Sequence, residues 1–242
     1  MSSTAQPAAA STMPAPMTMR EVLRIPALRR LWYAQLVSVF GDFLALFAVI
    51  TIITFKLHAN AQQVIGIQIA YMGPIAVLGV LSGVFVDRWP IKRTMVASDL
   101  LRAGLCGSLF FVHSVWGFYV ALAAISVVSS FFSPAQGVAV RSTVPIHGLR
   151  SGTALMQQVM FIMRIVGGPI ATTLVAAFGA KICYGFDSAS FVASSLLIAS
   201  VSLHAAPKGV EAAAAGTEEK GGVARVVDDM KEGASFIFHH AA

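Results

Sequence analysis

Two long stretches without a charged side chain constrain the fold more than any other feature of this sequence. No Asp, Glu, Lys or Arg occurs from Leu57 to Val86 or from Ala103 to Val140. Each stretch exceeds the roughly 20 apolar residues that an α-helix needs to span a bilayer. Of the 242 residues, 57% are hydrophobic and only 12% are charged, about half the charged share of soluble domains. The pattern predicts a protein that crosses a membrane several times.

Polar breaks divide the apolar region into six predicted spans. Because backbone polar groups in lipid must bond within the protein, we expect helices rather than open strands. The predicted helices cover residues 31–57, 63–86, 93–113, 116–139, 153–178 and 182–204. They make up a transmembrane domain over 31–204, between a disordered, basic N-terminus over 1–30 and a cytoplasmic segment over 205–242. The apolar stretch after Arg30 is too long for a signal-peptide core.

Lysine and arginine are distributed unequally between the two sides of the predicted bundle. Thirteen lie in the N-terminal segment, the 87–93 and 141–151 loops and the tail, whereas the alternate loops hold only Lys56 and Lys181. The positive-inside rule therefore predicts a multi-pass membrane protein with both termini in the cytoplasm. We interpret the net charge of +6 as this orientation signal, and we predict no nucleic-acid partner.

A repeated tetrapeptide and two similarly placed aspartates suggest that the chain contains two structural repeats. Gly-Pro-Ile-Ala occurs at 73–76 and again at 168–171, and Asp99 and Asp187 occupy similar places in the third and sixth predicted helices. Three helices per repeat would give the second repeat the opposite topology, as in many secondary transporters. Pro74 and Pro169, within the two tetrapeptides, are expected to kink their helices.

Five ionisable side chains lie inside the predicted spans, where insertion of each costs about 2.5–3.5 kcal/mol at the bilayer centre. They are Asp42, Asp99, Arg102, Arg164 and Asp187. Asp99 and Arg102 are three residues apart on one helix face, which predicts a structural ion pair. Asp187 lies near the predicted outer end of its helix, and we interpret it as an interfacial or packing residue.

Asp42 and Arg164 are predicted to lie at the same depth. Each follows the start of its span by eleven residues, which places both about 16 Å into the membrane. A pair would form if the first and fifth helices touch. Two interpretations stay open, a permanent salt bridge and a pair that senses protons or substrate in a wet cavity. In the second, a carboxylate whose arginine partner moves away takes up a proton.

The loop between the second and third predicted helices reads Gly83-Val-Phe-Val-Asp87-Arg88-Trp89-Pro90-Ile91-Lys92-Arg93. It resembles the signature loop of the major facilitator superfamily, with Pro90 in the place of a second glycine. Gly168-Pro169 resembles the antiporter motif of the same superfamily, although Thr172 and Thr173 stand where glycines are expected. Four further segments resemble the bacterial exporters that include the enterobactin exporter and macrolide efflux proteins: Leu31–Asp42, Ala97–Ala103, Ser130–Ala135 and Phe186–Phe191.

The resemblance implies half of a twelve-helix fold in which two six-helix halves rock around a central site. It implies a gating loop and a partner for Asp87 at the end of the fourth helix: Gly83, Asp87, Arg88, Lys92, Arg93 and Arg141. Because the first and fourth helices line the cavity in that family, it also implies that Asp42 and Gln35 are proton or substrate candidates. Arg164 joins them through its predicted pairing with Asp42.

Only six of twelve helices are present. Val223, Val226, Val227, Met230 and Ile237 recur at helical spacing, which predicts an amphipathic helix in the central loop of such a transporter. We therefore expect a truncated gene product or fragment that is inactive without its C-terminal half. A half-size protein that acts as a dimer, or a membrane scaffold that does not transport, is the alternative.

The predicted function is proton-coupled efflux of small amphipathic molecules such as drugs or siderophores. The predicted partners are the lipid bilayer, the substrate, protons and either the missing half or a second copy. No cofactor or metal is predicted, and Cys106 and Cys183 are interpreted as inert packing residues. The sequence holds neither His-Glu-x-x-His nor Gly-x-Ser-x-Gly, so we do not expect an enzyme.

Overall fold

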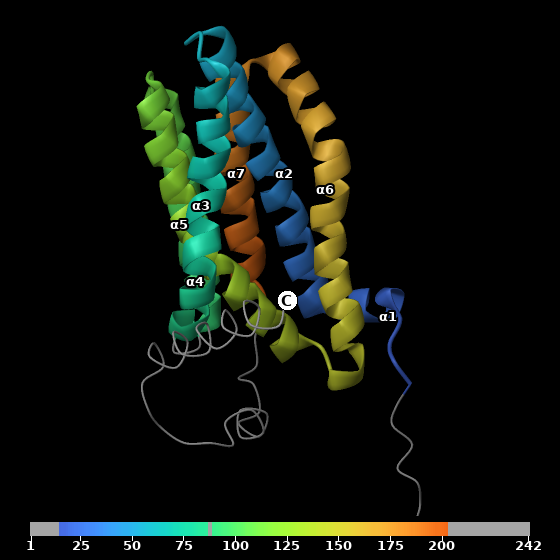
Figure 1. Ribbon diagram of the computed structural model, residues 1–242. Coiled ribbons are helices and arrows are strands. Elements are labelled where there is room, and N and C mark those ends of the chain that lie inside the picture. The colour runs from blue at the N-terminus through green and yellow to red at the C-terminus, as the bar shows by residue number, and fades with distance from the viewer. Residues whose placement is uncertain (1–14, 87–88, 203–242) are drawn as a thin grey trace, which may run out of the picture.

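The computed structural model describes residues 15–86 and 89–202, without the side chains of residues 80–81 and 83–86. Within this part, six long helices run up and down as a bundle (Figure 1). They are α2 (Pro26–Phe55), α3 (Ala61–Val86), α4 (Ile91–Ser108), α5 (Val115–Thr143), α6 (Leu149–Phe178) and α7 (Ala180–Ala199). Each contains or lies in a segment long and apolar enough to cross a membrane, and the described residues contain no strand. The predicted all-α membrane fold with six spans is confirmed.

All six helices begin one to five residues before the predicted starts. Hydropathy marks the part of a helix that lies in hydrocarbon, whereas the helix itself continues into the polar interface. Two 3₁₀ turns, Leu109–Phe111 and Ile146–Gly148, lie in or near the connections.

The prediction that residues 1–30 are disordered is wrong for the part that the structure describes. A short helix, α1 (Met19–Leu23), precedes α2. Thr18 and Glu21 form a capping box at its start, and these hydrogen bonds from Thr18 hold the pKa of the Glu21 carboxyl below its usual value. Pro26 occupies the first turn of α2, where its missing N–H is not needed.

The N-terminal segment is attached to the start of α6. The Met17 N–H donates to the His147 carbonyl at 3.2 Å, and the Ser151 hydroxyl donates to the Met17 carbonyl at 2.6 Å. Val22 is fully buried. These contacts define the α1 end of the bundle; the opposite end carries the connections at 56–60, 112–114 and 179.

The packing of the helices has an internal symmetry. α2 packs against α6 and α7, α5 packs against α3 and α4, and α4 packs against α7. Exchanging α2 with α5, α3 with α6 and α4 with α7 leaves this set of contacts unchanged. The predicted arrangement as two three-helix repeats is therefore confirmed.

Two large apolar clusters fill the bundle, one toward each end, and a small third cluster of Val39, Val159 and Met163 lies between α2 and α6. On α2, the cluster at the α1 end includes Leu28 and Leu31, and the cluster at the opposite end includes Leu44 and Ile53. The residues between them on α2, α4 and α7 are more polar, so a polar layer separates the two halves of the core.

The helices that contain Pro74 and Pro169 continue through both residues. α5 does the same at Pro134. After Pro169, the Thr172 hydroxyl donates to the Gly168 carbonyl at 2.8 Å and the Thr173 hydroxyl donates to the Pro169 carbonyl at 2.9 Å. Each threonine thus bonds the carbonyl four residues earlier, which is the usual pairing for a threonine inside a helix. The carbonyl that loses its helical donor at Pro169 is that of Ile165, so these bonds do not replace the missing one.

Candidate functional site

The polar layer contains three carboxylates and one guanidinium. Asp42 comes from α2, Asp99 and Arg102 come from α4, and Asp187 comes from α7. Asp99, Asp187 and Arg102 are at most 3% exposed, whereas the Asp42 side chain is 17% exposed. With all four groups ionised the layer would carry two uncompensated negative charges, which is unfavourable in a bundle interior.

Arg102 lies at the centre of this layer. Its guanidinium donates to Asp99, and one terminal nitrogen lies 4.0 Å from a carboxylate oxygen of Asp42. The guanidinium carbon also lies 4.4 Å from the ring centroids of both Phe132 and Phe191. Ion pairing and cation–π contact together compensate for the removal of this cation from water.

Asp187 has a different environment. It accepts a hydrogen bond from the Cys106 thiol at 2.7 Å and one from the Ser190 hydroxyl at 3.3 Å. The described residues place no guanidinium or ammonium group within salt-bridge distance of it. The interpretation of Cys106 as an inert packing residue therefore needs correction, because its thiol donates to a buried carboxylate.

The symmetry of the repeats extends to these side chains. An offset of 88 residues relates Asp99 to Asp187, Arg102 to Ser190 and Cys106 to Ser194. Accordingly, Ser194 donates to Asp99 at 2.6 Å as Cys106 donates to Asp187. The two halves of the layer differ in charge because α7 carries serine where α4 carries arginine.

Gly41 allows α2 and α7 to approach closely beside this layer. A Cβ atom at this position would overlap the side chains of Asp187 and Ser190. The glycine is thus required for the position of Asp187 and not only for helix packing.

The predicted pairing of Asp42 with Arg164 is wrong. α2 and α6 do touch, but Arg164 is exposed on α6, and Asp42 lies beside Arg102 instead. Depth in the membrane limits which layer a side chain can reach. The rotation of each helix about its axis then decides which side chains meet.

Gln35 is buried between α2 and α5. Its side-chain oxygen accepts a hydrogen bond from Gln136 at 2.5 Å. The sequence reasoning does not identify Gln136, although this residue follows the Ser130–Ala135 segment directly. Asp42 lies seven residues beyond Gln35 on α2, two turns along the same helix face.

Part of the predicted gating loop lies outside the described residues. This holds for Asp87 and Arg88, so the predicted contact between Asp87 and Arg141 stays a prediction. Lys92 and Arg93 lie in the first turn of α4, and Arg141 lies in the last turn of α5. Between them, the Trp89 ring stacks on Phe131 with centroids 5.9 Å apart, which attaches the loop to α5.

Two inverted three-helix repeats around a buried charged layer define a half-bundle of the kind from which secondary transporters are built. The chain belongs to the Major Facilitator Superfamily, whose family model matches residues 31–238.

Curated relatives agree with this assignment. The chain is 28% identical to the uncharacterized MFS-type transporter YfiS of Bacillus subtilis over 68% of its own length. It is 25% identical to the MFS-type transporter YkuC of the same organism over 86% of its length, and 25% identical to macrolide efflux protein A of Streptococcus pyogenes over 71%. These alignments cover 40%, 49% and 43% of the three relatives, respectively. The chain therefore spans less than half the length of the curated relatives it matches.

Proposed function

We propose that this chain is the N-terminal half of a secondary active transporter that expels small amphipathic molecules and couples their movement to protons. A relative named as a macrolide efflux protein supports the direction and the class of cargo. The coverage of less than half of each relative supports the assignment as a half. In this proposal the half needs its counterpart to transport, and it resides in a bacterial inner membrane with both termini in the cytoplasm.

The excess of carboxylates over guanidinium groups in the polar layer is the main support for the proposal of proton coupling. One guanidinium balances one of three carboxylates, so protons are the simplest source of the missing positive charge. Asp42 is the best carrier because its side chain is the most exposed of the three. Its distance of 4.0 Å from Arg102 is also longer than the direct hydrogen bond between Arg102 and Asp99.

The position of Asp42 on a different helix links the proton to motion. Asp99 and Arg102 share α4 and would move together, whereas Asp42 belongs to α2. A shift of α2 relative to α4 would therefore change the separation of Asp42 from Arg102 and leave the Asp99–Arg102 pair intact. In the proposed cycle, loss of this contact favours protonation of Asp42, and its return favours release.

Other candidates have supporting roles in the proposal. Gln35, with Gln136, would present amide groups to cargo along α2 and α5. Arg164 is exposed within a span, where a charged group is unfavourable in lipid, so we propose that it faces the cavity or the other half. The Gly83–Arg93 loop and Arg141 would brace the closed cytoplasmic gate.

The proton step can be tested on this chain in detergent or nanodiscs. Infrared difference spectra between low and high pH report the carboxyl C=O stretch of a protonated aspartic acid. The sequence has 11 Asp and Glu residues, so exposed carboxyls also titrate and the spectra of variants are compared. We expect Asp42→Asn to remove one component of the titrating C=O absorption, at the position of a carboxyl shielded from water. Glu21→Gln removes an exposed carboxyl outside the bundle, and as the matched control it should leave that component in place. Loss of no such component in Asp42→Asn would exclude Asp42 from the coupling role.

Transport itself is tested with the reading frame that includes codons beyond 242. Efflux of a macrolide and a compound panel should require a pH gradient and should collapse in the Asp42→Asn variant. Expression of the 242-residue chain alone should give no efflux. The alternative is a half-size protein that acts as a dimer. It would be favoured if the chain alone gave efflux, if its mass in detergent were that of a dimer, and if cysteines placed in the Gly83–Arg93 loop cross-linked two copies.

A further inference from the structure

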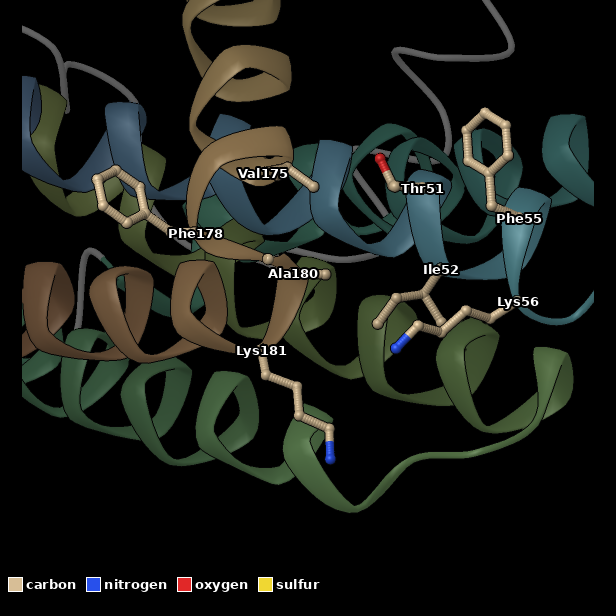
Figure 2. Close-up of a pocket in the computed structure, with 9 residues that line it drawn as sticks. Thr51, Ile52, Phe55, Lys56, Val175, Phe178, Ala180 and Lys181 are labelled. Carbon is tan, nitrogen blue, oxygen red and sulfur yellow. The ribbon is translucent and has the colours of Figure 1, made fainter.

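Two lysines line one cavity at the end of the bundle opposite α1. Lys56 follows the last residue of α2, and Lys181 lies in the first turn of α7. Both line a cavity of about 270 Å³ whose wall also includes Phe178 at the end of α6 (Figure 2). Two loops far apart in the sequence thus bring their basic residues to the same place.

No acidic side chain accompanies these lysines in the sequence around them. There is no Asp or Glu between Asp42 and Asp87 or between Asp99 and Asp187. Asp187 lies six residues after Lys181, about 9 Å along the helix, and is buried. The N-terminus of α7 has no side-chain cap, so its free N–H groups add to the positive potential at the same cavity.

An apolar groove continues from this cavity along the bundle. It has a volume of about 460 Å³ between α2, α6 and α7, and Phe178 lines both cavities. Leu44, Leu174 and Phe186 are among its apolar walls. Phe178 and Phe186 are 54% and 59% exposed, so the groove is open on the outside of the described helices.

The length of the combined site matches one leaflet of a bilayer. From Ala180 at the lysine cavity to Ala193 at the far end of the groove, α7 advances by thirteen residues, which is roughly 20 Å. The hydrocarbon of one leaflet is about 15 Å thick, half of the roughly 30 Å core. A charged head and an apolar tail of these dimensions describe a membrane lipid.

We propose that the two cavities form one binding site for an anionic phospholipid, with the headgroup phosphate at Lys56 and Lys181 and an acyl chain in the groove. Charge complementarity selects the headgroup, because two lysines and the first residues of α7 line this cavity without a carboxylate among the lining residues. The groove selects an acyl chain over a soluble anion. The far end of that chain would lie beside Gly41 and Ser190, which also line the groove.

Native mass spectrometry of the purified chain tests this site. The chain is incubated with equal amounts of phosphatidylglycerol and phosphatidylcholine that carry identical acyl chains. We expect preferential retention of phosphatidylglycerol, with about fivefold for each lysine that contributes. Lys56→Gln with Lys181→Gln should abolish the preference, and Lys56→Arg with Lys181→Arg should keep it. The matched control, Arg24→Gln with Arg150→Gln, removes two exposed cations at the α1 end and should change nothing.

A second arm tests the groove. Ala189→Phe places a ring in the groove, since Ala189 lines it, and should lower retention of both lipids. Glycerol phosphate, which has the anion without acyl chains, should fail to displace phosphatidylglycerol. Equal retention of the two lipids, an unchanged preference in the double lysine-to-glutamine variant, or displacement by glycerol phosphate would each overturn the proposal. None of these outcomes depends on whether the protein transports.

Discussion

Arg102 determines the charge balance of the bundle interior. It contacts carboxylates from α4 and α2 and lies between rings from α5 and α7. A buried ion pair of this kind contributes little relative to apolar residues of the same size, but removal of one partner leaves an uncompensated charge. The effect of a substitution at Arg102 therefore depends on what happens to the carboxylates.

Replacing Arg102 with Met should strongly destabilise the chain. We expect a loss of about 3–5 kcal/mol in the free energy of unfolding, because the buried carboxylates lose the guanidinium that pairs with them. The double variant Arg102→Met with Asp99→Asn should recover part of this loss. Denaturant unfolding in detergent measures both values.

Arg164→Met is the matched control for the Arg102 variant. It removes an arginine from a span, but one that is exposed on α6, so unfolding of the 242-residue chain should change little. Equal destabilisation by the two substitutions would contradict the central role assigned to Arg102.

Among the helices, the crossing of α2 and α7 holds Asp187 in place. Gly41 lets the two helices approach, and Ser190 and Asp187 occupy the space where a Cβ would lie. The same spacing of positions i, i+3 and i+7 runs along α4 (Asp99, Arg102, Cys106) and along α7 (Asp187, Ser190, Ser194). The α4–α7 contact is therefore a matched pair of polar stripes within an otherwise apolar bundle.

Gly41→Ala should destabilise the chain by about 1–3 kcal/mol, because an added methyl group overpacks the crossing. Gly104→Ala is the matched control, since a Cβ there meets no described atom within 4 Å, and it should be neutral or slightly stabilising. Thermal unfolding in detergent compares the two.

Accessibility of Cys106 to a thiol reagent is a second measurement on the same variants. It should rise in Gly41→Ala only, because displacement of Asp187 removes the hydrogen-bond acceptor of the Cys106 thiol. Equal behaviour of the two alanine variants would argue against a close crossing.

The complete bundle is one member of a pair in the proposed transporter. Its two repeats are related by symmetry. Among the described residues, the basic side chains concentrate at the α1 end, apart from Arg102 and Arg164 within the spans and the two lysines of the proposed lipid site. The proposed orientation in the membrane rests on this concentration and is open to a direct test.

His58→Cys and His147→Cys place single exposed thiols at opposite ends of the bundle. The native cysteines are both buried and should label slowly. In intact cells without their outer membrane, we expect a membrane-impermeant maleimide to label His58→Cys, and His147→Cys only after permeabilisation. The reverse pattern would overturn the proposed orientation with both termini in the cytoplasm.

The number of spans, the helical fold and the repeat can all be predicted from the amino-acid sequence. Hydrophobic length and the need to satisfy backbone polar groups in lipid leave few alternatives for such a chain. Contacts within one helix also follow from spacing, so the shared face of Asp99 and Arg102 is a property of the sequence alone. The short helix α1 is not predicted, because its five residues show no repeating pattern of apolar side chains. Thr18 and Glu21 nevertheless have the spacing of a capping box.

The charges that meet across helices depend on the packing of the folded bundle. Asp42 and Arg164 have matched depth in the sequence, but Asp42 lies beside Arg102 because helix rotation, set by side-chain packing, directs it toward α4. The hydrogen bond from Cys106 to Asp187 depends likewise on the approach of α4 to α7. The depth of a side chain in the membrane can be counted along the sequence. Which side chains meet at that depth depends on the rotation of each helix and on which helices are neighbours, and only the packing of the folded bundle determines these.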